Sequence, residues 1–143
     1  NVSLNGNPAA ADVAGWSADQ VLDHLERVSL PQSRAWIRQH KVEADRHNLA
    51  LIAYEAGQHA VGVQGGENSE ALTRVLTSAN RHPRMAGLYR RYLDAWADEG
   101  GGVICLFAST SSWSKWGSWG LLEYADDPAD RPKFRAVMDW MKR

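Results

Sequence analysis

The run Leu49-Ala50-Leu51-Ile52-Ala53-Tyr54 (residues 49–54) decides the fold class, together with a second run, Val103-Ile104-Cys105-Leu106-Phe107-Ala108 (residues 103–108). Neither run alternates between apolar and polar side chains, which is typical of strands covered on both faces in a parallel sheet. Apolar residues at helical spacing surround the two runs and predict helices over about 17–30, 33–47, 69–79, 83–99 and 132–143. This order of helices and strands predicts an α/β fold.

Two buried parallel strands do not make a self-sufficient sheet, so the chain is expected to be part of a larger fold. Its 143 residues suit one domain, residues 1–143. Residues 1–15 carry Gly, Pro and Asn without periodicity, which predicts a leading loop. The exposed edges of the strands predict pairing with another copy of the chain or with the remainder of the fold.

Composition excludes several classes of protein. Sixteen Lys and Arg against seventeen Asp and Glu leave a net charge of −1, so no basic excess attracts nucleic acid. The longest apolar runs are far shorter than the roughly 20 residues that cross a membrane. No dinucleotide- or phosphate-binding motif is present, so the sequence implies no cofactor. It leaves the compartment open, with secretion or the periplasm as the alternatives.

Cysteine and histidine usage argues against a metal centre. Cys105 is the only cysteine, which excludes an internal disulfide and a cysteine-based zinc site. Because Cys105 lies in an apolar run, its thiol is expected to be buried and inert. The five histidines lack the spacing of zinc-binding motifs. The sequence therefore predicts no bound metal.

The residues after the first run carry the candidate chemistry, because sites in parallel α/β folds lie beyond the carboxyl ends of the strands. Glu55 follows the run directly. A period of two places Glu55 on the same face as Leu51 and Ala53, pointing into the site. The alternate residues are expected to face covering helices: Ile52 and Tyr54. Gln58 and His59 come next and can bind a hydroxyl group or orient the carboxylate. The alternative is that Glu55 is a solvated loop residue.

The second run leads into a loop in which Trp113, Trp116 and Trp119 recur at a spacing of three among small hydroxyl residues. Flat indoles with a polar edge are suited to stacking on sugar rings, so this tryptophan loop (residues 109–120) predicts a sugar subsite. The alternative is that two of the three indoles pack inward. The other four indoles lie at core-facing positions in or beside helices and are expected to be core: Trp16, Trp36, Trp96 and Trp140.

A glycosidase needs two carboxyl groups beside the scissile bond, and Glu123, just after the tryptophan loop, is a candidate partner for Glu55. The sequence favours the alternative that Glu123 is a surface residue or one in the approach to a helix, because nothing nearby would raise its pKa as an acid requires. Asn80 and Arg84 flank Pro83 and are expected to act as structural buttresses.

Four stretches together carry a resemblance to a known family: L-I-A-Y-E-A-G-Q-H (51–59), A-N-R-H-P-R-M (79–85), L-Y-R-R-Y-L-D-A-W (88–96) and S-K-W-G-S-W-G-L-L-E (114–123). They resemble the C-terminal part of the (β/α)8 barrels of clan A-like glycoside hydrolases, among them bacterial proteins described as carbohydrate-binding or cellulose-binding. The resemblance runs from about residue 17 to the end. It implies that residues 103–108 are the eighth strand and that the seventh ends in Glu55, the nucleophile.

The fold implied by this resemblance is the C-terminal portion of a (β/α)8 TIM-type barrel. The tryptophan loop would line the sugar cleft, and the helix from Pro132 would close the barrel. In the family the acid/base carboxylate lies at the end of the fourth strand, which these 143 residues do not contain. The given chain therefore lacks the catalytic pair, and we interpret it as a piece that starts in the loop after the sixth strand.

The leading hypothesis is a retaining glycoside hydrolase acting on a polysaccharide or oligosaccharide as part of a complete barrel. Glu55 would attack the anomeric carbon, with the side chains of Gln58, His59 and the three loop tryptophans binding substrate. Two alternatives remain: a carbohydrate-binding module without turnover, and a purely structural barrel fragment. The expected partners are a carbohydrate and either the remainder of the barrel or a second copy of the chain.

Overall fold

Helices and short parallel strands alternate along the chain in the computed structural model, which describes residues 2–3 and 8–143. The elements are β1 (Val2–Ser3), α1 (Ala10–Ala14), α2 (Ala18–His24), η1 (Leu25–Ser29), α3 (Leu30–Arg46), β2 (Ala53–Ala56), β3 (Gln58–His59), η2 (Gly66–Asn68), α4 (Glu70–Arg81), α5 (Met85–Asp98), β4 (Ile104–Leu106) and α6 (Pro132–Trp140). The predicted α/β class is thus confirmed at the level of a mixed structure with a small parallel sheet. The expected leading loop is replaced in part by β1 and α1, and residues 1 and 4–7 lie outside the described residues.

All strand pairing in the described part of the chain is parallel. β2 pairs with β4 in one two-stranded sheet, and β1 pairs with β3 in another. In each sheet helices lie between the two paired strands along the chain, as expected of βα units. β2 contains a bulge: Ala53 lies opposite Ile104 and Ala56 lies opposite Leu106. Three steps along β2 therefore match two steps along β4, and one residue of β2 is extra.

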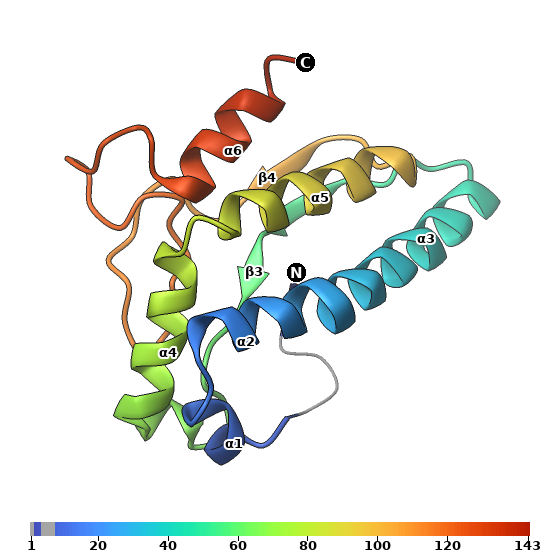
Figure 1. Cartoon of the computed structure of the whole chain (residues 1–143). Helices are drawn as coiled ribbons and strands as arrows, with labels where there is room; N and C mark the ends of the chain where they lie inside the picture. Colours follow the sequence, from blue (N-terminus) through green and yellow to red (C-terminus); the bar gives the residue numbers. More distant parts are fainter. Residues whose placement is uncertain (1, 4–7) are drawn as a thin grey trace.

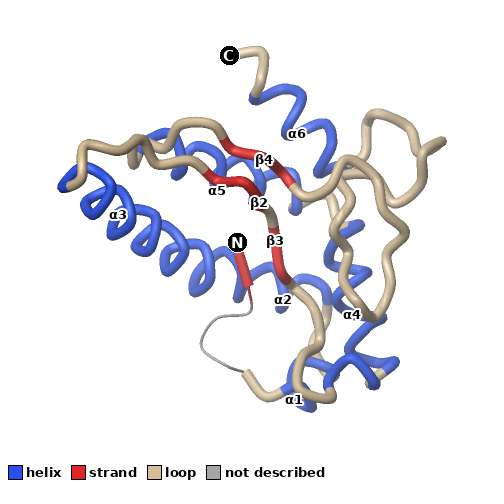
Figure 2. Tube along the Cα trace, turned by 180° about the vertical axis from the view of Figure 1, so that it is seen from behind, coloured by secondary structure: helices blue, strands red, loops and turns tan. Residues whose placement is uncertain are grey.

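Helices cover only one face of the strands. In Figure 2 the strands lie in front of α5, and no helix crosses in front of them. Tyr54 is 89% exposed and Ile52 62% exposed, and Val103, Cys105 and Phe107 are exposed as well. The prediction of strands buried on both faces is wrong for this chain, because the second face is largely open: Trp119 packs edge-on against Phe107, and the side chains named above stay exposed. For the same reason Cys105 is exposed rather than buried.

The first two predicted helices are one continuous helical segment from α2 through η1 to α3 (Figure 1), rather than two separated at Pro31. The Leu30 amide donates to the Leu25 carbonyl, which is the i to i−5 bond of a π turn. Proline lacks an amide hydrogen and its ring clashes with the carbonyl four residues earlier in a regular α-helix. The wider turn immediately before Pro31 accommodates both, so the helix continues. Ser17 caps its start with the predicted capping box.

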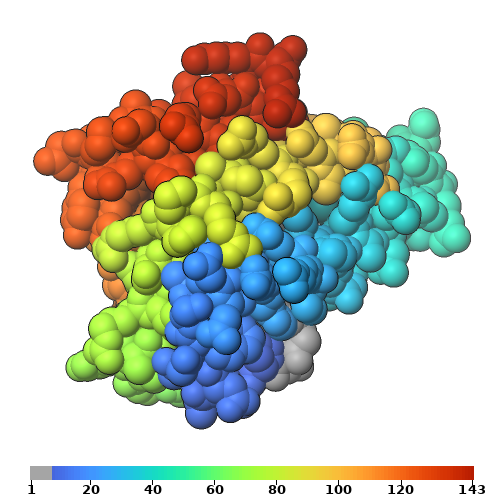
Figure 3. All heavy atoms as spheres, viewed as in Figure 1, coloured from blue at the N-terminus to red at the C-terminus, as the bar shows by residue number. Residues whose placement is uncertain are grey.

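The core lies among α2, α4 and α5 and the covered face of the strands. In Figure 3 the yellow α5 lies between the red α6 and the blue N-terminal helices. Of the tryptophans expected in the core, Trp96 is buried, whereas Trp36 is 45% exposed. The apolar spacing of the last helix would place Met138 and Met141 on its buried face, but both are exposed. On the same helix, the side chain of Lys133 is fully buried.

Candidate functional site

Glu55 lies in the bulge of β2, and the bulge decides where its carboxylate points. Ala53 and Ala56, three residues apart, both face the helices, so the two residues between them share the opposite, exposed side: Tyr54 and Glu55. The expectation that Glu55 shares a face with Leu51 and Ala53 is therefore wrong. An extra residue interrupts the period of two on which that prediction rests.

Just after Glu55 the chain turns inward, at Gly57. The glycine has φ of 137°, which side-chain-bearing residues rarely adopt, and it is buried. Two tyrosines of α5 hold this turn: the Tyr92 hydroxyl is hydrogen-bonded to the backbone of Gly57 and the Tyr89 hydroxyl to that of Gln58. The end of β2 is thereby fixed onto the helix behind it.

Gln58 is 3% exposed, and both ends of its amide are engaged inside the protein. Its Nε2 donates to the Ser118 carbonyl at 2.7 Å, and its Oε1 accepts from the Ala60 amide at 2.8 Å. The predicted contact between Gln58 and a substrate therefore does not fit this structure. Its side chain instead joins the strand end to the tryptophan loop.

His59 and Trp119 bring the strand end and the loop together, as the sequence predicts. Their ring centroids are 4.9 Å apart, and Phe107, at the end of β4, packs edge-on against Trp119 at 6.3 Å. Burial lowers the pKa of His59, and the nearby Glu55 carboxylate partly opposes this by favouring the protonated ring. Glu55 is thus within electrostatic reach of the imidazole that contacts the indole.

A groove of about 590 Å³ runs along β2 on the side facing α3, and Glu55 lines it. Its other walls are largely aromatic and come from three elements: Trp36 and His40 of α3, Tyr54 of β2, and Tyr92 and Trp96 of α5. Glu55 is the one carboxylate among the described residues that line this groove. Ligand sites combine this range of volume, aromatic walls and few polar groups.

None of the three loop tryptophans lines this groove. Trp116 is 65% exposed at the loop tip, where the Lys115 ammonium lies 4.7 Å from its ring centroid. Trp113 is half-buried under the loop, and its Nε1 donates to the Gly120 carbonyl. The three indoles therefore do not line one surface. Trp119 is beside His59, Trp116 is exposed with Lys115 against its ring, and Trp113 is half-buried under the loop.

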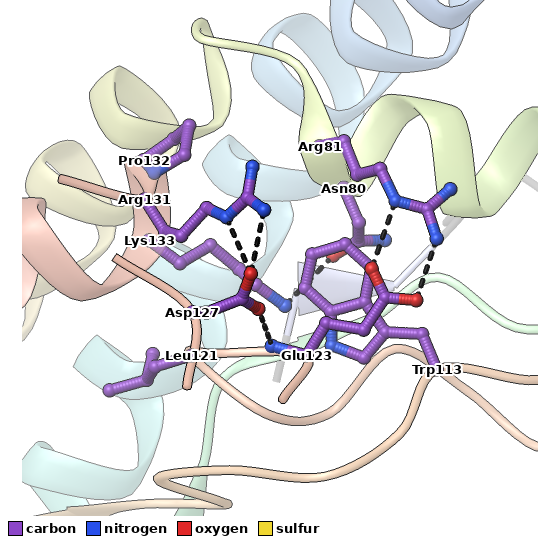
Figure 4. Close-up of a pocket in the computed structure, with 9 residues that line it drawn as sticks. All are labelled: Asn80, Arg81, Trp113, Leu121, Glu123, Asp127, Arg131, Pro132 and Lys133. Carbon is purple, nitrogen blue, oxygen red and sulfur yellow. Dashed lines mark hydrogen bonds and ion pairs between the residues drawn. The ribbon is translucent and has the colours of Figure 1, made fainter. Parts of the chain in front are cut away.

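A second polar centre lies under the loop, around Lys133 of α6 (Figure 4). Lys133 is 1% exposed, and its Nζ donates to the Ser118 carbonyl at 2.7 Å and to Asn80 Oδ1 at 3.2 Å. The ammonium also lies 4.2 Å from the Trp113 ring centroid. Burial lowers its pKa to about 7, while Glu123 acts in the opposite direction. A cavity of about 20 Å³ adjoins it, enough for a water molecule.

Glu123 is buried in this centre and not on the surface; of the two predicted alternatives, it is the residue in the approach to a helix, α6. Arg81 binds both carboxylate oxygens of Glu123, at 2.9 and 2.6 Å (Figure 4). Beside it, Asp127 accepts from two backbone amides and from Arg131. These carboxylates stabilise the segment that leads into α6, and Glu123 is not free to act beside Glu55. Asn80 is the expected buttress, because it is fully buried and accepts from Lys133.

Nothing in the sequence singles out Lys133, since a lysine one residue after a helix-starting proline is usually solvated. Within residues 2–3 and 8–143, no cluster of three His, Cys, Asp or Glu side chains is arranged to hold a metal ion. No helix in the described ranges has the length and apolar character needed to span a membrane. Comparisons of the chain with protein-family models, with curated proteins and with solved structures gave no match.

Proposed function

We propose that this chain is the carbohydrate-active C-terminal part of a (β/α)8 barrel, in which Glu55 is the nucleophile of a retaining glycoside hydrolase. The observation that carries the proposal is the contact between the His59 and Trp119 rings beside the ends of β2 and β4, with the Glu55 carboxylate near enough to favour the protonated imidazole. It combines a solvent-facing carboxylate, an imidazole and an indole, which are groups that attack, orient and stack on a sugar.

The aromatic surface around the strand ends adds to this support. Trp119 and Phe107 extend the aromatic surface beyond the strand ends. In this proposal Trp116 contacts a sugar farther along the chain, whereas Trp113 and Gln58 support the loop from inside.

The uncovered face of β2 and β4 supports the barrel part of the proposal. Ile52, Tyr54, Val103 and Phe107 form an apolar surface of a kind that proteins normally cover. In a (β/α)8 barrel that face would be the packed interior, and the free edges of the strands would pair with neighbouring strands. The partner we propose is the remainder of the barrel, with a second copy of the chain as the alternative.

Sugar binding is tested on the chain itself by titrating it with oligosaccharides and following tryptophan fluorescence. Trp119→Ala should weaken the affinity and reduce the quenching, while Trp16→Ala, just before α2 and outside the proposed site, should leave the affinity unchanged. If no β-linked or α-linked oligosaccharide quenches the wild-type emission, the carbohydrate proposal is rejected.

Turnover is tested in a protein that contains the complete barrel. Glu55→Gln should remove most hydrolysis and leave sugar affinity nearly unchanged, because the amide keeps the shape of the carboxylate but is not a nucleophile. Glu70→Gln, a substitution of another exposed carboxylate, is the matched control. Wild-type rates in the Glu55 variant would reject its role.

A carbohydrate-binding module without turnover is the second candidate. It is favoured by the ion pair between Glu123 and Arg81, which removes the nearest sequence candidate for an acid/base partner. Binding of an oligosaccharide without release of product by the complete barrel would decide for this candidate.

A further inference from the structure

The carbonyl oxygen of Ser118 is the point at which three separate elements meet. It accepts a hydrogen bond from Gln58 of β3 and another from Lys133 of α6, each at 2.7 Å. Ser118 is itself 2% exposed, and it immediately precedes Trp119. The backbone just before Trp119 is therefore held by two donors, one from the strand end that carries His59 and one from the last helix, while the Ala108 amide donates to the Trp119 carbonyl itself.

Lys133 is the more unusual of these two donors. Burying an ammonium group costs several kcal/mol unless its hydrogens are satisfied, and an apolar side chain would fill the same space without that cost. Here the ammonium bonds to Ser118 and Asn80 and lies over the Trp113 ring. What the lysine supplies and an apolar residue does not is a set of bonds that converge on the tryptophan loop.

We propose that Lys133 is a positioning residue that holds Trp119 against His59 by anchoring the Ser118 carbonyl to α6. Lys133 and Gln58 donate to the same carbonyl. Lys133 links the loop to α6, and Gln58 links it to the strand end. The role of this anchor in sugar recognition rests on the function proposed above. The anchor can be tested without a sugar, so one proposal can be refuted while the other stands.

The test uses the titration of His59, which responds to Trp119 and not to general stability. Burial lowers the pKa of His59 from 6.5, and the Trp119 ring, 4.9 Å away, is part of what buries it. We would label the full chain with 15N at histidine, assign His59 with His59→Gln, and follow its ring nitrogens by NMR against pH. Trp119→Ala sets the value that His59 reaches when the indole is absent.

In the folded Lys133→Met variant, the pKa of His59 should move upward, toward the Trp119→Ala value. The matched control is Lys142→Met, which removes an exposed lysine just beyond the same helix and should leave the His59 titration at its wild-type value. A Lys133→Met protein that is folded, by circular dichroism, with an unchanged His59 titration would overturn the proposal. So would an equal upward change in the Lys142 variant.

If Lys133→Met does not fold, two further measurements decide. In Lys133→Ala, added ethylammonium should bring the His59 titration back toward wild type, because the cation can occupy the vacated site, and absence of any recovery counts against the anchor. In the wild-type protein, the Nζ hydrogens of Lys133 should exchange with water far more slowly than those of Lys142. Equal exchange rates would show that Lys133 is not bonded in the interior and would overturn the proposal.

Discussion

The buried ammonium of Lys133 makes the stability of the protein depend on pH in an unusual direction. Its pKa is lowered from 10.5 to about 7 in the folded state, first by burial, with Glu123 opposing. Below about pH 7 the lysine is protonated in both states and the cost of burying the charge is fully present. Between about pH 7 and 10.5 the unfolded chain binds the proton and the folded chain does not, so stability rises with pH.

The magnitude follows from the size of the pKa change. Over the whole interval it corresponds to about 5 kcal/mol, of which about 2 kcal/mol falls between pH 7 and 9. The bonds from Lys133 to Ser118 and Asn80 also stabilise the charged form, so these values are upper bounds. The other charged groups around Lys133 form two carboxylate–guanidinium ion pairs, Glu123 with Arg81 and Asp127 with Arg131. They keep their charges between about pH 7 and 9 and so do not add to this pH dependence.

Urea unfolding of wild type and Lys133→Met at about pH 7, 8 and 9 measures the effect. The free energy of unfolding should increase with pH in the wild type and stay nearly constant in the variant, and Lys142→Met should follow the wild type. The range stops at about pH 9 because burial raises the pKa of Tyr89 and Tyr92, whose ionisation would destabilise the fold at higher pH. Parallel curves for wild type and Lys133→Met would refute the assignment of the linkage to this ammonium.

Three further substitutions probe other parts of the structure. Arg81→Met should lower the free energy of unfolding by about 2 kcal/mol, because the buried carboxylate of Glu123 loses both its guanidinium bonds; Arg74→Met, in an exposed pair, should change it little in the same denaturant assay. Gly117→Ala should destabilise the loop by roughly 1–3 kcal/mol and alter the near-ultraviolet circular dichroism, since φ is 129° there and an added Cβ would overlap the Trp119 ring. Hydrogen bonds from two arginines of α3 lower the pKa of Glu99 to about 2. The stability that Glu99 contributes is therefore present above about pH 4.5 and is lost as the pH falls toward 2. Glu99→Gln should flatten the acid side of a plot of melting temperature against pH.

The helices were predictable because their signals are local. The capping box at Ser17, the serine cap at Ser69 and the apolar spacing of α5 depend only on residues a few positions apart. The parallel direction of the strands also followed from the order of elements along the chain. The break expected at Pro31 did not occur, because a π turn just before it changed the hydrogen-bonding pattern that makes proline incompatible with a helix.

The candidate site was predictable only in part of its membership and not in its geometry, because the side chains of Gln58 and Trp113 are engaged inside the protein. Glu55, His59 and Trp119 were expected at the strand ends and lie there. The direction of the Glu55 side chain depends on one extra residue in β2 relative to β4, and a bulge is defined only by the partner strand. Gln58 was expected to contact substrate, but its amide is closed off by a carbonyl from the tryptophan loop, 60 residues away in sequence.

By itself, the sequence determined the helices from Ser17 onward, apart from the break at Pro31, and the approximate places of β2 and β4, since these depend on local pattern and on chain order; β2 begins at Ala53 rather than at Leu49. Only the tertiary structure decided that one face of the strands is open, that Glu123 is buried against Arg81, and that Lys133 is an interior cation. The physical reason is the same in each case. Burial and pairing depend on surroundings that distant parts of the chain supply. The residues next to an ionisable side chain in sequence do not indicate whether water or a carbonyl oxygen will solvate it.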